Sequence, residues 1–234
     1  MLVAGLGGGM VWLANRSPKT TTPTPIAGDA TIAPTVTAVA GDANTEPLTH
    51  DISSIDYVVN KKRPLPSDYA PRDLVEYQGI QMRQEAMTAL KHLVETAVSE
   101  DYIVRLLSGY RSYADQEWTY GQYVKDYGQA DADTFSARPG HSEHQTGLAL
   151  DIGGKNQACD TNICFADTPL GLWLKDNAYK FGFIERYQKG KEAVTGYQFE
   201  PWHLRYVGVE LASELKSTGK TLEEHFGLPG GDYN

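Results

Sequence analysis

The stretch HSEHQTGLALD, residues 141–151, places two histidines, a glutamate and an aspartate in one short segment. A second stretch, EPWH at residues 200–203, adds Glu200 and His203. A catalytic zinc site takes about three protein ligands from His, Asp, Glu or Cys and keeps one position open. His144, Asp151 and His203 form such a set, and Glu200 is a candidate general base beside it. The two stretches therefore indicate a metal centre.

Each of these residues also has an ordinary structural interpretation. A lone histidine is more often a surface or core residue than a ligand, and Asp151 could cap the Gly-Gly turn that follows it. Glu200 and Pro201 could form a simple strand exit. Because the two stretches lie about 50 residues apart, their spacing alone leaves both interpretations open.

The pattern of both stretches resembles a known family. Ser142-x-His144-x-x-Gly147-x-Ala149-x-Asp151, together with EPWH, is similar to the zinc D-alanyl-D-alanine carboxypeptidases of the VanY type. Their relatives are the L,D-carboxypeptidases LdcB and DacB, within the M15 peptidases. SGYRS (residues 108–112) and GYQFEPWHLRYVG (residues 196–208) resemble the same family. The resemblance covers roughly residues 52–226, with three separate motifs in the family's order.

The resemblance implies a metal site and a general base. One Zn²⁺ ion would be held by His144, Asp151 and His203, and Glu200 would take a proton from the attacking water. His141 has no ligand role in the family pattern and is interpreted as a loop residue. Gly147 and Ala149 are expected to matter because a larger side chain at either position would crowd the floor of the metal site.

The resemblance also implies a substrate pocket. Arg111 matches an arginine near the substrate carbonyl or carboxylate, where a guanidinium offers a planar fork of donors. The other positions implied to contact substrate are Ser142, Gln116, Tyr187 and Trp202. Glu185 and Gln188 depart from the family pattern, which leaves the outer pocket open.

The implied reaction removes the terminal D-Ala from a peptidoglycan stem peptide, at the D-Ala-D-Ala bond of the pentapeptide. The alternative is an L,D-carboxypeptidase that converts the tetrapeptide to the tripeptide. A peptidoglycan endopeptidase and a non-catalytic wall-binding module are weaker alternatives. The chain has all three ligands and the base, which disfavours the binding module. An endopeptidase of this family would usually carry a separate wall-binding domain, and the tether found here instead disfavours that alternative.

The composition is that of a globular protein with one domain. The 234 residues include 21 Lys+Arg and 30 Asp+Glu, a formal charge of 21 − 30 = −9. No dense basic stripe is present in the sequence, so nucleic acid is excluded as the main partner. Nothing in the sequence requires more than a monomer.

The first 50 residues differ in character from the rest. Residues 1–16 form an apolar stub, shorter than the roughly 20 apolar residues that span a bilayer. It is interpreted as the remnant of a membrane anchor, with a floppy apolar tail as the alternative. Residues 17–50 are rich in Thr, Pro and Ala and predict a disordered tether. A zinc carboxypeptidase domain over residues 51–234 would then lie at the extracellular face of the membrane, in the cell wall.

Apolar periodicity predicts an α+β domain with a small, mostly antiparallel sheet flanked by helices and the zinc site at the sheet. We expect helices over residues 80–98, 112–127, 167–182, 207–215 and 222–226, strands over 102–107, 148–152, 183–187 and 197–200, and a loop over 130–143. Cys159 and Cys164 are close enough in sequence to form a disulfide, and two free thiols remain the alternative.

Overall fold

A four-stranded antiparallel sheet in the order β3-β4-β6-β5 organises the chain, and a separate hairpin pairs β1 with β2. The structure, a computed structural model, describes residues 51–233. The predicted anchor remnant (1–16) and tether (17–50) lie outside the described residues. Within residues 51–233 the mixture of helices and antiparallel strands confirms the predicted α+β class.

The strands and helices alternate irregularly along the chain. The strands are β1 (Leu74–Tyr77), β2 (Ile80–Arg83), β3 (Arg105–Ser108), β4 (Ala149–Gly153), β5 (Phe183–Tyr187) and β6 (Glu200–Tyr206). The α-helices are α1 (Gln84–Ser99), α2 (Tyr113–Tyr127), α3 (Gln129–Phe135), α4 (Pro169–Asn177), α5 (Glu192–Thr195), α6 (Val209–Thr218) and α7 (Leu222–Phe226). Short 3₁₀ turns are η1 (Glu143–Thr146), η2 (Gln157–Cys159), η3 (Ile163–Asp167) and η4 (Ala178–Phe181).

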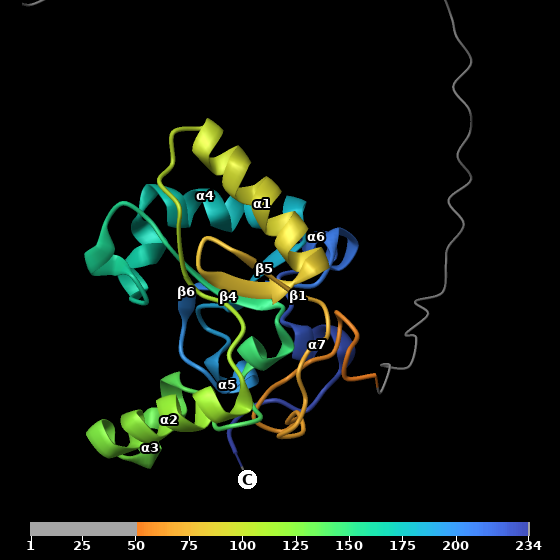
Figure 1. Cartoon of the computed structure of the whole chain (residues 1–234), viewed down its shortest axis with the longest axis vertical. Coiled ribbons are helices and arrows are strands. Elements are labelled where there is room, and N and C mark those ends of the chain that lie inside the picture. The colour runs from red at the N-terminus through yellow and green to blue at the C-terminus, as the bar shows by residue number, and fades with distance from the viewer. Residues whose placement is uncertain (1–50, 234) are drawn as a thin grey trace, which may run out of the picture. The chain divides into compact units, whose positions relative to one another are not determined.

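The sheet has one apolar face and one polar face. Leu150 and Ile152 of β4 and Leu204 of β6 belong to the main core, together with residues of α1 and α4. Figure 1 shows α1 and α4 along one side of the sheet, while α2 and α3 project on the other side. Because side chains alternate along a strand, a residue that lies between two core residues points away from the core. Asp151 lies between Leu150 and Ile152, and His203 lies between Trp202 and Leu204.

Strand register brings the two motif stretches together. In the pairing of β4 with β6, Asp151 lies directly opposite His203, and in the pairing of β3 with β4, Ser108 lies opposite Asp151. Side chains of directly opposed residues are typically only about 4.5–5.5 Å apart at Cβ. The sheet thus joins residues that the sequence separates by about 50 positions.

Three predicted elements are wrong in part. The helix predicted from Ile80 begins at Gln84, because its first four residues form β2, which pairs with β1 across a Gln78-Gly79 turn. Both turn residues have positive φ (48° and 83°), as tight hairpins require. The loop predicted over 130–143 contains most of α3. The strand predicted over 197–200 instead runs from Glu200 to Tyr206, continuing through a proline that usually argues against a strand.

The two cysteines form a disulfide. Cys159 and Cys164 are bonded, with Cα atoms 5.4 Å apart. Cys159 belongs to the main core on the side of α4, so the bridge fixes the loop after β4 against that core. Separately, none of the helices within residues 51–233 is both long enough and apolar enough to cross a bilayer.

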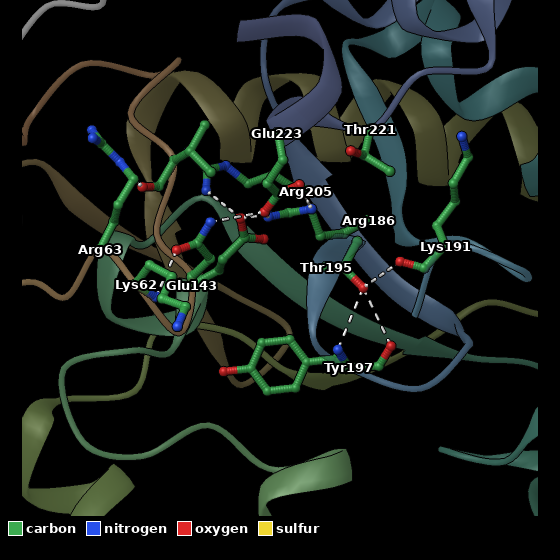
Figure 2. A network of polar contacts seen from close by, with 12 residues as sticks. Lys62, Arg63, Glu143, Arg186, Lys191, Thr195, Tyr197, Arg205, Thr221 and Glu223 are labelled. Carbon is green, nitrogen blue, oxygen red and sulfur yellow. Dashed lines mark hydrogen bonds and ion pairs between the residues drawn. The ribbon is translucent and has the colours of Figure 1, made fainter. Parts of the chain in front are cut away.

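A buried network of charges lies under the polar face of the sheet (Figure 2). Arg186 of β5 donates from Nε to Glu143 Oε1 (2.8 Å) and from its two terminal nitrogens to Glu223 (2.9 and 2.6 Å). Arg205 of β6 donates to the same Glu143 oxygen (2.9 Å), and Asn60 donates to Glu223 (3.1 Å). All four charged side chains are at most 1% exposed. The network therefore links η1, β5, β6 and α7.

Replacing Arg186 with methionine should strongly destabilise the domain. The change removes one cation from a buried cluster and leaves Glu223 without its main partner, which typically costs about 3–5 kcal/mol in the free energy of unfolding. Urea denaturation measures this loss. Lys191→Ala is the control, because the Lys191–Glu224 pair is about 30% exposed on both sides and should contribute less than about 1 kcal/mol. Equal small losses in both variants would contradict the expectation.

Candidate metal centre and active site

His144 lies in η1 with its ring orientation fixed by the backbone. Its Nδ1 is 2.7 Å from the carbonyl oxygen of Gly109. A carbonyl oxygen can only accept a hydrogen bond, so Nδ1 carries the proton and Nε2 keeps a lone pair. That Nε2 faces Asp151 Oδ2 at 3.4 Å. His144 is thus prepared to be a ligand through Nε2.

Asp151 and His203 complete a compact cluster with His144. His203 Nδ1 is 3.2 Å from Asp151 Oδ1, and ligand atoms of the three buried residues all lie within 4.8 Å of one another. Asp151 Oδ1 is buried and makes no well-formed hydrogen bond within the described part of the chain. Tetrahedral zinc with ligand bonds of about 2.0–2.1 Å separates its ligand atoms by roughly 3.3–3.4 Å. The cluster fits such an ion.

The charges in the cluster also favour a cation. Burial opposes ionisation of Asp151, but the positive charge of His203 helps to hold the pKa of this carboxyl well below its usual range. Burial lowers the pKa of His144, which keeps that ring neutral. Burial would also lower the pKa of His203, but Asp151 and Glu143 raise it to about 9. Without metal, the protonated His203 ring therefore supplies positive charge next to Asp151.

The raised pKa of His203 predicts pH-dependent zinc affinity. Below about pH 9 the metal-free protein holds a proton on His203 that zinc must displace, and this competition grows as the pH falls. The zinc dissociation constant should rise by up to about tenfold for each pH unit between 9 and 7. Competition titration with a chromophoric chelator measures it. An ordinary histidine, with a pKa of about 6.5, would give a nearly constant value over this range.

Glu200 lies beside the cluster at the start of β6. Its Oε2 is 3.9 Å from His203 Nδ1, too far for a hydrogen bond between them. Burial raises the pKa of Glu200 to about 8, against the opposing charge of His203. A cation in the cluster would favour the ionised form. Glu200 is therefore a buried carboxylate placed to exchange a proton next to the metal position.

Arg111 and Gln116 lie together at this site. Arg111 donates to Gln116 Oε1 (2.9 Å) and to Ser108 Oγ (3.0 Å), and its backbone N–H donates to the carbonyl of His144 (3.2 Å). Gln116 in turn donates to the carbonyl of Ala137 (2.7 Å) and is almost fully buried. The guanidinium is thus held in place while further N–H donors stay available. Its charge acts on both His144 and Glu200.

Two of the other predicted pocket residues lie close to the metal ligands. Ser142 is buried and directly precedes η1, which carries His144. The Tyr187 ring is 4.9 Å from the His203 ring, and burial raises the Tyr187 pKa, so its phenol stays neutral. Trp202 belongs to the main core with Leu204, and its contact with substrate stays a prediction.

Gly147 is small for a reason other than the one predicted. It ends η1 in the left-handed region (φ 68°), and a Cβ there would lie 3.0 Å from Leu74 and 3.1 Å from Arg83. Its neighbours are therefore the β1–β2 hairpin residues, and the expectation of a crowded metal floor is wrong. Glycine is required by the turn and by this close approach.

The buried charges around Glu143 have no counterpart among the residues predicted from the sequence. Arg205 stands between buried neighbours in β6, and Arg186 stands between the half-buried Glu185 and the buried Tyr187 in β5. A charged residue at an inward position of a strand is uncommon unless it is paired. That pattern is the signal from which a buried network could have been expected, although it does not name the partners.

Comparison with known proteins agrees with this geometry. The model of the VanY D-alanyl-D-alanine carboxypeptidase family matches residues 79–209. YodJ of Bacillus subtilis (strain 168) is 44% identical over 179 residues, which cover 72% of this chain and 66% of YodJ, slightly less than two thirds of that protein.

Two solved structures are also similar. The LdcB LD-carboxypeptidase superposes with a TM-score of 0.72 and 41% identity, covering 78% of this chain and 90% of that one. A mutant of the vancomycin resistance D,D-pentapeptidase VanY in complex with Zn(II) gives a TM-score of 0.65 and 33% identity, covering 74% and 98%. With the family match and the His144–Asp151–His203 cluster, these likenesses show that the chain belongs to the VanY D-alanyl-D-alanine carboxypeptidase family of M15 peptidases.

Proposed function

We propose that this protein is a zinc-dependent carboxypeptidase that removes the terminal D-Ala from peptidoglycan stem peptides, at the D-Ala-D-Ala bond of the pentapeptide. The observation that carries the proposal is the buried cluster of His144, Asp151 and His203 with Glu200 beside it. The family match and the zinc-bound VanY relative support the chemistry.

The proposed mechanism divides the work among the residues of the site. When bound by His144, Asp151 and His203, zinc supplies Lewis acidity that polarises the scissile carbonyl and activates water. Glu200 takes a proton from the attacking water and passes it to the leaving amine of D-Ala, so that its carboxylate is restored. Arg111 donates hydrogen bonds to the substrate's terminal carboxylate. Its bonds to Gln116 and Ser108 fix that direction.

A second candidate is an L,D-carboxypeptidase that converts the tetrapeptide to the tripeptide. The observation in its favour is the greater similarity to LdcB, with 41% identity and a TM-score of 0.72 against 33% and 0.65 for the zinc-bound VanY. The two reactions need the same ligands and base, because they differ in the stereochemistry and length of the peptide.

Mass spectrometry of stem peptides separates these candidates. Pentapeptide and tetrapeptide are incubated with the zinc-loaded protein, with and without a chelator. Chelator-sensitive loss of one D-Ala from the pentapeptide is the expected result. Loss from the tetrapeptide alone would assign the L,D reaction, and cleavage of neither peptide by zinc-loaded protein would reject both.

We further propose that a monomer acts at the extracellular face of the membrane, held by the apolar stub (1–16) and the tether (17–50). The support is the composition of these segments together with the wall peptide that the proposed reaction requires. The full chain should then sediment with membranes, whereas a secreted chain that begins at residue 51 should not. Recovery of both chains in the soluble fraction would contradict the proposal.

A further inference from the structure

Glu143 joins the buried charge network to the metal cluster. Its Oε1 accepts hydrogen bonds from both Arg186 (2.8 Å) and Arg205 (2.9 Å). Its Oε2 lies 3.5 Å from His203 Nε2. Both of these facing atoms are buried, and neither has a hydrogen-bond partner within residues 51–233.

The geometry assigns a different task to each oxygen of this carboxylate. The two guanidinium groups come from neighbouring strands β5 and β6, converge on Oε1 and so fix the plane and position of the group. The second oxygen is then directed at the ring of His203. A carboxylate oxygen only accepts hydrogen bonds, so it can stabilise a proton on Nε2 and nowhere else on that ring.

We propose that Glu143 is a positioning residue of the metal centre, which keeps the Nε2 proton of His203 in place and thereby presents the Nδ1 lone pair to the metal. The inference rests on the proposed zinc function. Histidine ligands commonly donate their second N–H to a carboxylate that sets tautomer and ring orientation. Here His203 Nδ1 faces Asp151 (3.2 Å) while Nε2 faces Glu143.

The network also explains why Glu143 holds this position. Arg186 is held on its far side by Glu223 of α7, which accepts a further bond from Asn60 (3.1 Å). Figure 2 shows Glu143, Arg186, Arg205 and Glu223 gathered in one group. A carboxylate so restrained loses little freedom when a metal binds, which is the condition for a preorganised ligand shell.

The sharpest test is Glu143→Gln. Because both arginines donate to the Oε1 position, the glutamine carbonyl must remain there, and its NH₂ group then faces His203. Two donors would oppose each other, which disfavours a proton on Nε2 and with it metal ligation through Nδ1. Zinc affinity, measured by chelator competition, should fall by about 10- to 100-fold.

Glu223→Gln is the matched control. It also replaces a buried carboxylate that pairs with Arg186, but Glu223 contacts neither His203 nor the other two ligands. Glu223 reaches the metal cluster only through Arg186, and Arg205 still donates to Glu143 Oε1 in this variant. Its zinc affinity should therefore fall by no more than about threefold, clearly less than that of Glu143→Gln. ¹⁵N spectra of the histidine rings in the zinc-loaded proteins give a second readout. They should show a protonated Nε2 and a metal-bound Nδ1 for His203 in the wild type and in Glu223→Gln.

The outcomes separate this inference from the proposed function. If the wild type binds no zinc, both fail. If the wild type binds zinc and Glu143→Gln binds it equally well, or loses the same factor as Glu223→Gln, only the positioning role is overturned. Should Glu143→Gln not fold, Glu143→Asp keeps the charge between the arginines but withdraws the carboxylate from His203 by one methylene. Unchanged zinc affinity in that folded variant likewise overturns the inference.

Discussion

Glu200→Gln should lower turnover by about 10²- to 10⁴-fold, the usual contribution of a general acid–base residue. The amide has nearly the shape of the carboxylate, so the protein should fold and bind zinc as before. It cannot accept a proton from water or return one to the leaving amine. Because Glu200 Oε2 is 3.9 Å from His203 Nδ1 and Glu200 is not one of the three clustered ligands, the metal should be retained.

The measurement pairs single-turnover kinetics on a stem peptide with zinc content by atomic absorption. Glu185→Gln is the matched control. Glu185 is also a partly buried acid whose pKa burial raises, but it lines a separate cavity of about 940 Å³ with Lys175 and Lys216. The control should retain nearly full turnover. Turnover within tenfold of wild type in Glu200→Gln would place the base elsewhere.

His203→Ala should abolish stable zinc binding and reduce activity by about 10³-fold or more. The change removes one of three ligands, and the Lewis acid that is lost with the metal is worth several kcal/mol of transition-state stabilisation. Each 1.36 kcal/mol corresponds to a factor of ten. Equilibrium dialysis against buffered zinc, followed by peptide assay, measures both effects.

The control for this prediction comes from the same region of sequence. His141 precedes His144 by three positions, but its Nδ1 contacts the carbonyl of Asn60 (2.9 Å) and it is not in the cluster. His141→Ala should therefore keep its zinc. Normal zinc content in His203→Ala would show that His203 is not a ligand. Loss of zinc from His141→Ala would show that His141 is a ligand in addition to the three clustered residues.

The ligands were accessible from the sequence because their chemistry is local. His144 and Asp151 stand in one short motif, and His203 follows Glu200 by three positions. Whether these residues lie together in space depends on strand register, which their spacing in the sequence does not predict. The family resemblance was what indicated that they form one site. In the structure, Asp151 lies opposite His203 in the pairing of β4 with β6, and this register brings the two motifs together.

The remainder of the site depends on contacts between distant segments. Glu143 stood in the quoted motif, but its partners Arg186, Arg205 and Glu223 come from three other elements. No local period indicates which buried charges will pair. The misplaced start of β6 has a related cause, because tertiary pairing with β4 and β5 overrode the local signal of a proline within the strand.

The position of β6 in the chain sets the order in which the protein can acquire its metal. The nascent chain leaves the ribosome from its N-terminus, at about 5–20 residues per second in bacteria and eukaryotes taken together. Until residue 203 of the 234 has been synthesised, only His144 and Asp151 of the ligand set exist. Glu223, which holds Arg186 against Glu143, comes later still. Zinc capture must therefore wait until β6 has been synthesised, and a chain that is terminated before residue 203 would compete poorly for the ion.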